Sequence, residues 1–314
     1  MAYMRGTPAA PEHPILWVDR SGRTSTLHAE PGTYANPRLS PDGKRLALTV
    51  LKGTNWDIWV YDLERQVFTR ATFEEGAETE QVWSPDSREL AYSLDVGGTR
   101  SVLYRRPADG SGAATVVARP EGLLWPQAWS PDGRLLAVTS GLEDIGVLPA
   151  AGGDPKPTWI VNSTFGETDP AISPDGRFVA YTSRESGQAE IYVRQFPSGS
   201  GRWQVSRNGG AYPRWANGGR ELFYRTMTGI MMVPMDTNGT SLRAGTPIEL
   251  FRGDFAGGLQ GIAVNQYIFG DFDVSADGSR FVMFPKPVDS GASMRLITVV
   301  TNWFDELARV AGQR

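Results

Sequence analysis

The tetrapeptide Ser40-Pro41-Asp42-Gly43 decides the fold, because the sequence repeats it at a nearly constant interval. Three close copies follow at Ser84-Pro85-Asp86-Ser87, Ser130-Pro131-Asp132-Gly133 and Ser173-Pro174-Asp175-Gly176. Two diverged copies are Ala216-Asn217-Gly218-Gly219 and Ser275-Ala276-Asp277-Gly278. Their first positions are 44, 46, 43, 43 and 59 residues apart. Periods of about 40–45 residues are typical of the four-stranded blades of a β-propeller.

Each copy has the composition of a tight turn between two antiparallel strands. Proline fixes φ at the first central position, aspartate hydrogen-bonds to its own backbone, and glycine accepts the left-handed conformation. The aspartates recur because the turn requires them. We therefore interpret all five as structural rather than as metal ligands: Asp42, Asp86, Asp132, Asp175 and Asp277.

Apolar residues flank every turn at the same offsets. Six and eight positions after each first residue stand pairs such as Leu46 and Leu48, or Val179 and Tyr181, with a further apolar residue between them. A strand that is apolar on both faces is expected between two neighbouring sheets. The repeat therefore predicts an all-β fold, a six-bladed β-propeller of four-stranded antiparallel blades.

The two ends of the chain are predicted to close one blade together. No fourth strand follows Arg295–Val300, the expected third strand of the last unit. Near the N-terminus, Ile15–Asp19 and Thr24–Leu27 have the patterns of a third and a fourth strand, and pairing the termini removes free sheet edges. Both Arg295–Val300 and Ile15–Asp19 thus have the pattern of the third strand of that blade. Seven blades, with a split blade that includes Met1–Arg5, is the alternative.

We expect residues 1–314 to form a single propeller domain. The 59-residue interval before the last turn implies a glycine-rich insertion near residues 252–268. A short helix is expected near residues 303–310.

The composition of the 314 residues excludes several functional classes. A net charge of −4 without a Lys/Arg cluster argues against a nucleic-acid partner. The absence of cysteine excludes thiolate catalysis, and two histidines, His13 and His28, cannot make a three-histidine zinc site. No Gly-x-Ser-x-Gly motif occurs, and no apolar run approaches the ~20 residues that a membrane span needs. We expect no membrane insertion by this chain.

The residues near the ring axis can be located by counting back from the turns. The innermost strand of a propeller blade lines the axial channel, so positions just before each turn should reach its mouth. Four positions before the turns stand Asn36, Glu80, Pro126, Asp169, Tyr212 and Asp271. The predicted ligand-binding mouth consists of Asn36, Glu80, Trp125, Gln127, Asp169, Tyr212, Arg214 and Asp271.

Three interpretations of this mouth are open. Its side chains can be solvated or can form hydrogen bonds between blades. They can instead bind a polar ligand. In the third interpretation, Glu80, Asp169 and Asp271 hold a metal such as Ca²⁺, which takes six to eight oxygen ligands and can act as a Lewis acid. Arg38 and Arg214 are expected to point across the channel and pair with the acids. Exposed rings of Trp125 and Tyr212 would suit stacking on a sugar or anchoring a peptide.

The patterns Asn36-Pro-Arg-Leu-Ser-Pro-Asp-Gly and Asp57-Ile-Trp-Val-Tyr-Asp resemble the TolB-type, WD-repeat-like β-propeller family. The stretch Ile15-Leu-Trp-Val-Asp-Arg-Ser-Gly and the ending Ile297-Thr-Val-Val-Thr-Asn-Trp-Phe-Asp-Glu-Leu look like propeller regions attached C-terminally to bacterial serine/threonine protein kinases. This chain carries none of the kinase catalytic motifs.

The resemblance implies a non-catalytic binding module, a sensor or scaffold domain of a larger bacterial protein. Its partner would be a protein or peptide, or a small polar ligand, with the chain itself monomeric. An extracytoplasmic or periplasmic location is favoured over a cytoplasmic one. The alternative function is a Ca²⁺-dependent hydrolase or lyase that acts in the axial funnel.

Overall fold

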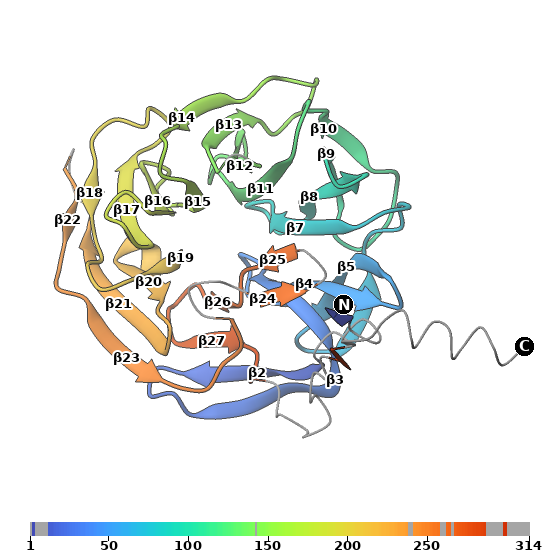
Figure 1. Cartoon of the computed structure of the whole chain (residues 1–314), viewed down its shortest axis with the longest axis horizontal. Helices are drawn as coiled ribbons and strands as arrows, with labels where there is room; N and C mark the ends of the chain where they lie inside the picture. The colour runs from blue at the N-terminus through green and yellow to red at the C-terminus, as the bar shows by residue number, and fades with distance from the viewer. Residues whose placement is uncertain are drawn as a thin grey trace, which may run out of the picture.

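A computed structural model shows a ring of antiparallel β-sheets around a central axis (Figure 1). It describes residues 12–257 except 142 and 238–240, residues 262–264 and 267–286, and the two short strands Ala2–Tyr3 (β1) and Thr298–Val299 (β28). Strands make up nearly all of the regular structure in these ranges, with one 3-10 turn at Asn217–Gly219. No helix within them is long and apolar enough to cross a membrane.

Three consecutive sheets have four strands each, ordered from the axis to the rim along the chain. The first contains β7 (Glu78–Trp83), β8 (Glu89–Val96), β9 (Arg100–Pro107) and β10 (Thr115–Ala118). The second contains β11 (Leu124–Trp129), β12 (Leu135–Ser140), β13 (Ile145–Pro149) and β14 (Thr158–Val161). The third contains β15 (Glu167–Ile172), β16 (Phe178–Ser183), β17 (Glu190–Gln195) and β18 (Trp203–Gln204).

The next sheet has a divided outer edge. Its inner strands are β19 (Ala211–Ala216), β20 (Glu221–Arg225) and β21 (Gly229–Asp236). Two strands share the outer side of β21, namely β22 (Arg243–Ala244) and β23 (Ile248–Arg252).

The remaining strands form one continuous seven-stranded path that closes the ring. It contains β26 (Phe272–Val274), β27 (Arg280–Met283), β2 (His13–Asp19), β3 (Thr24–Leu39), β4 (Arg45–Lys52), β5 (Asn55–Asp62) and β6 (Val67–Arg70). The long strand β3 joins two sheets, because its first half pairs with β2 and its second half pairs with β4. The N-terminal segment thus supplies the two outer strands of the last sheet, as predicted.

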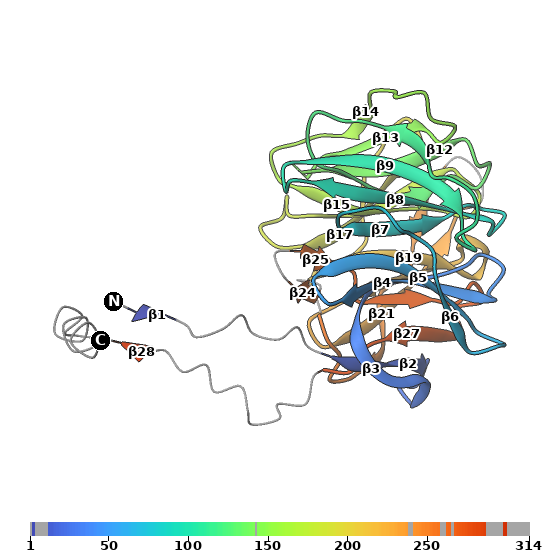
Figure 2. The ribbon, with the colours of Figure 1, turned by 90° about the vertical axis from the view of Figure 1, so that its right-hand side faces the viewer.

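Arg295–Val300 was predicted to be the third strand of the last unit and therefore to pair with its second strand, and this pairing was wrong. Its two described residues, Thr298–Val299, pair with Ala2–Tyr3 and not with β27 (Figure 2). The reason is that β27 already has β26 on one side and β2 on the other. The expected helix near residues 303–310 lies outside the described residues, and the blade number of the complete chain stays a prediction.

The second strand of each sheet is buried on both faces, as the repeat predicts. Leu46, Ala47 and Leu48 are all fully buried, and the equivalent triplets of β12, β16, β20 and β27 are buried in the same way. Each large side chain buried in this way contributes about 1.5–3 kcal/mol. The hydrophobic core therefore lies between the sheets rather than at the axis.

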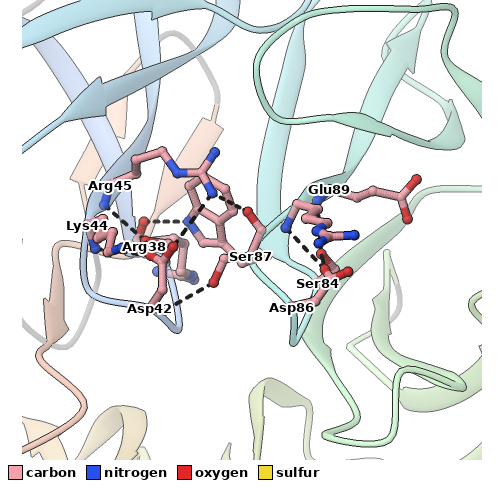
Figure 3. A network of polar contacts seen from close by, with 11 residues as sticks. Arg38, Asp42, Lys44, Arg45, Ser84, Asp86, Ser87 and Glu89 are labelled. Atoms are coloured by element: carbon pink, nitrogen blue, oxygen red, sulfur yellow. Dashed lines mark hydrogen bonds and ion pairs between the residues drawn. The ribbon is translucent and has the colours of Figure 1, made fainter.

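The repeated turns are held by the serine and the aspartate of each tetrapeptide (Figure 3). Ser84 Oγ donates to Asp86 Oδ1 at 2.6 Å, and that oxygen also accepts from Arg88 N at 3.1 Å. The Ser/Asp pairs of four other turns repeat this hydrogen bond. These bonds lower the pKa of Asp86, and they lower that of Asp277 to about 2. The turn aspartates are bound within their own turns.

Candidate binding site at the ring axis

Six innermost strands surround the axis in the order β3, β7, β11, β15, β19 and β26, with β26 in contact with β3. Five of them carry a register shift at the positions predicted to face the channel. Asn36, Glu80, Asp169 and Tyr212, all four positions before their turns, have φ between 49° and 58°. A positive φ is uncommon outside glycine, and a bulge redirects the side chains beside it. The bulge therefore turns residues on both sides of it toward the axis.

The structure brings most of the predicted mouth residues together. Asn36 Nδ2 and Gln127 Nε2 both donate to Glu80 Oε2, at 3.3 and 3.1 Å. Asp169 accepts from Thr168 Oγ1 at 2.8 Å. On the other side of the ring, Arg214 Nε lies 3.4 Å from Asp273 Oδ1. Side chains of different blades thus meet in a polar cluster around the axis.

Two arginines in this cluster have the same conformation. Arg38 Nη1 donates to the Pro37 carbonyl and Arg214 Nη1 donates to the Pro213 carbonyl, both at 2.9 Å. Both residues are buried, with 8% of Arg38 and 9% of Arg214 exposed. Desolvation, followed by the charge of Arg214, lowers the pKa of Arg38 to about 10. The two guanidinium groups therefore lie close enough to repel each other.

The acids of the cluster are shifted toward their neutral forms. Desolvation raises the pKa of Glu80 to about 7, although Arg38 and the hydrogen bond from Gln127 oppose the rise. Desolvation likewise raises the pKa of Asp169 and Asp273, with Arg214 and Arg38 opposing it. Ionisable groups perturbed in this way cluster at functional sites more often than elsewhere.

Asp271 is held in a buried ion pair, which changes its predicted role. Its Oδ2 accepts from Arg225 Nε at 2.9 Å, and both side chains are fully buried. Within the described residues, no group of three His, Cys, Asp or Glu side chains is arranged to hold a metal ion. The predicted ligand set Glu80, Asp169 and Asp271 is therefore not assembled, since a guanidinium neutralises its third member. These three residues do not fit a Ca²⁺ ion.

The two predicted aromatic anchors differ in exposure. Tyr212 is only 8% exposed, and desolvation raises its pKa well above the usual range. Its ring therefore belongs to the buried cluster rather than to an open stacking surface. Trp125 on β11 is half-buried and is the more accessible of the two.

Three residues of the site were missed by counting positions. Gln81, fully buried, donates to the Asn36 carbonyl at 2.6 Å, and Gly270 O accepts from Asn36 N at 3.1 Å. For Arg225, the sequence did contain a signal, a departure from the repeat. Arg225 stands nine positions after its turn, where the four preceding units have Thr49, Ser93, Thr139 and Thr182. Its departure from the repeat marks the buried ion pair.

Comparisons with known proteins agree with this fold. Residues 1–121 match the TolB beta propeller domain family. The putative TolB from Agrobacterium tumefaciens is 21% identical, with a TM-score of 0.68 over 88% of this chain and 99% of that one. TolB from Acinetobacter baumannii is 19% identical, with a TM-score of 0.60 over 78% and 64%. An oligogalacturonate lyase in complex with manganese is 16% identical, with a TM-score of 0.55 over 90% and 80%. The resemblance to kinase-attached propellers stays a prediction.

Proposed function

We propose that this TolB-type β-propeller is a non-catalytic binding module that takes a polar ligand, or a polar segment of a protein partner, at its axis. The observation that carries the proposal is the set of unpartnered polar atoms in the axial cluster. Arg214 Nη2 and Asn36 Oδ1 are buried and have no hydrogen-bond partner among the described residues. Buried polar groups in native proteins are nearly always paired, because an unpaired one costs about 1–3 kcal/mol. A bound ligand would supply the missing partners.

The module would serve as a sensor or scaffold domain of a larger bacterial protein. Propellers host many functions, so the fold by itself does not select one of them. The site supports a binding role because its charged side chains come from different blades and converge, and those that the structure describes form no metal set. The glycine-rich insertion includes the hairpin of β24 (Ile262–Val264) and β25 (Tyr267–Phe269), which Figure 1 shows projected over the inner part of the ring.

A thermal-shift screen tests the proposal. Metals, sugars, peptides and amino acids are added separately to the chain, with and without chelator, because a ligand of the native state raises the melting temperature. We expect at least one probe to raise it, and the Glu80→Gln/Asp169→Asn pair to abolish that shift. Glu249→Gln, which changes an exposed acid of the outer strand β23, is the matched control. Shifts that survive the axial pair, or a screen without any shift, would refute the proposal.

One observation favours the alternative of a hydrolase or lyase. Desolvation raises the pKa of Glu80 to about 7, which suits a general acid or base at neutral pH. The Ca²⁺ part of this alternative has no ligand set among the described residues. If the chain turns over an oligosaccharide or ester probe, Glu80→Gln should lower kcat by about 100-fold or more while leaving binding of that probe intact. Turnover that is unaffected by the substitution would exclude Glu80 as the catalytic group.

A further inference from the structure

Three polar atoms surround one point beside Gly270, and each either lacks a hydrogen-bond partner or belongs to a charged group. A β-carbon built on Gly270 would lie 3.6 Å from Arg214 Nη2, 3.6 Å from Arg38 Nη1 and 3.6 Å from Asn36 Oδ1. Arg214 Nη2 and Asn36 Oδ1 have no partner within the described part of the chain. The point is therefore lined by two positively charged donors and one acceptor.

Charge is distributed unevenly around the axis. On one arc, formed by β19, β26 and β3, Arg214 and Arg38 flank the single carboxylate of Asp273, so the ionised groups sum to +1. The facing arc of β7, β11 and β15 carries Glu80 and Asp169 with the neutral Gln127 between them. Its two carboxylates sum to −2 when both are ionised. The axial site thus has a positive and a negative side.

This polarity discriminates between classes of ligand. A simple anion would be attracted by the guanidinium groups but repelled by the facing carboxylates. A simple cation would be attracted by the carboxylates but repelled by the guanidinium groups. In addition, the described residues do not assemble a set of metal ligands. A small zwitterion satisfies both sides, since its carboxylate accepts from the arginines while its ammonium group donates to the acids and to Asn36 Oδ1. Charge-assisted hydrogen bonds of this kind are the strong ones in proteins.

The arginines are already held in place for such a ligand. Each one is anchored by the bond from its Nη1 to the preceding proline carbonyl, which leaves the Nη2 of Arg214 directed at the point beside Gly270. Holding a rotamer-rich side chain before binding reduces the entropy lost on association. Arginine also presents a planar pair of donors that matches a carboxylate.

We propose that the axial site binds a small zwitterion of the α-amino-acid type, with its carboxylate toward Arg38 and Arg214 and its ammonium group toward Glu80 and Asp169. This inference rests on the proposed binding function and names its ligand class. The competing occupant of the point beside Gly270 is an ordered water molecule, which can also accept two hydrogen bonds and donate one.

Gly270→Ala is the decisive variant. Its methyl group would occupy the point where the three atoms converge, at 3.6 Å from each of them, which is ordinary van der Waals contact and demands no shift of the protein. The backbone of Gly270 is not in the left-handed region, so alanine is sterically allowed there. Gly122→Ala makes the same change where nothing lies within 4 Å and serves as the matched control.

The experiment is a calorimetric titration of the wild-type chain with the common L-amino acids, one at a time. For an amino acid that binds, the matching amine without the carboxylate and the matching acid without the amino group are titrated next. We expect each truncated probe to bind at least about tenfold more weakly, a factor that corresponds to ~1.4 kcal/mol. Gly270→Ala and Arg214→Gln should each weaken the intact amino acid by a similar factor, and Gly122→Ala should leave it unchanged.

Each other outcome overturns the inference in a distinct way. Equal binding of the acid alone would show a plain anion site, and equal binding of the amine alone a plain cation site. Full affinity in Gly270→Ala would place the amino acid elsewhere on the molecule. If no amino acid binds but a sugar, peptide or metal of the wider screen does, and the axial substitutions abolish it, the zwitterion inference fails while the binding function stands. If nothing binds in either experiment, both fail.

Discussion

Removing the charge of Asp271 should destabilise the chain more than a change at any exposed acid. Asp271 and Arg225 are both fully buried, and Arg225 Nε donates to Asp271 Oδ2 at 2.9 Å. Asp271→Asn keeps the size and shape of the side chain but leaves the guanidinium of Arg225 without a counter-charge. Arg225 Nη1 would still donate to the Gly229 carbonyl at 3.1 Å, so the group would stay in place rather than turn to solvent.

The expected cost is about 3–5 kcal/mol, the usual penalty for leaving one partner of a buried ion pair uncompensated. Replacing both partners, as in Asp271→Leu/Arg225→Met, should cost less than the sum of the two single changes, because neither charge then remains buried alone. Glu249→Gln is the control, since its partner Arg252 has a side chain 71% exposed and such pairs contribute only about 0–1 kcal/mol.

The assay is equilibrium unfolding in urea, followed by tryptophan fluorescence. It compares the wild type, Asp271→Asn, the two single changes Asp271→Leu and Arg225→Met, their double variant and the control. The reasoning would be refuted if Asp271→Asn cost under about 1 kcal/mol, or no more than the control. Strict additivity of the two single changes would also contradict it, because a coupled pair must show an interaction energy.

Two further predictions concern the axis and the turns. Because the folded-state pKa of Glu80 is raised to about 7, its neutral form stabilises the fold at low pH, and this contribution is lost as pH rises from about 4.5 to 7. The wild type should therefore lose roughly 2–3 kcal/mol of unfolding free energy between pH 5 and pH 8 that the Glu80→Gln variant does not lose. Parallel pH profiles of the two proteins would exclude this prediction. At Ser87, where the turn has serine in place of glycine, φ is 63° and Oγ accepts from Asp42 N at 3.0 Å. Ser87→Ala should lower the unfolding free energy by about 1 kcal/mol, and Ser87→Gly by less, because glycine loses the bond but relieves the left-handed backbone; a larger loss in the glycine variant would reverse this account.

Much of the axial site was predictable from local spacing, and the reason is the repeat itself. A residue four positions before a turn must lie on the innermost strand, so Asn36, Glu80 and Asp169 could be assigned to the channel without any coordinates. The spacing could not predict their partners. Glu80 binds Gln127 from the next blade, and Arg214 pairs with Asp273 across 59 residues of sequence.

The sequence by itself determined the parts of this protein that depend on neighbouring residues. The Ser-Pro-Asp-Gly repeat specifies turns such as Ser84–Ser87, and the apolar triplets specify the buried strands. The N-terminal segments Ile15–Asp19 and Thr24–Leu27 were identifiable from the sequence as the closing strands. Only the tertiary structure decided which of the predicted acids is neutralised by a buried partner and which hydrogen bonds the others make. A bulge with positive φ and an ion pair such as Arg225–Asp271 depend on how separate blades pack, and chain positions 46 residues apart carry no local signal of their contact.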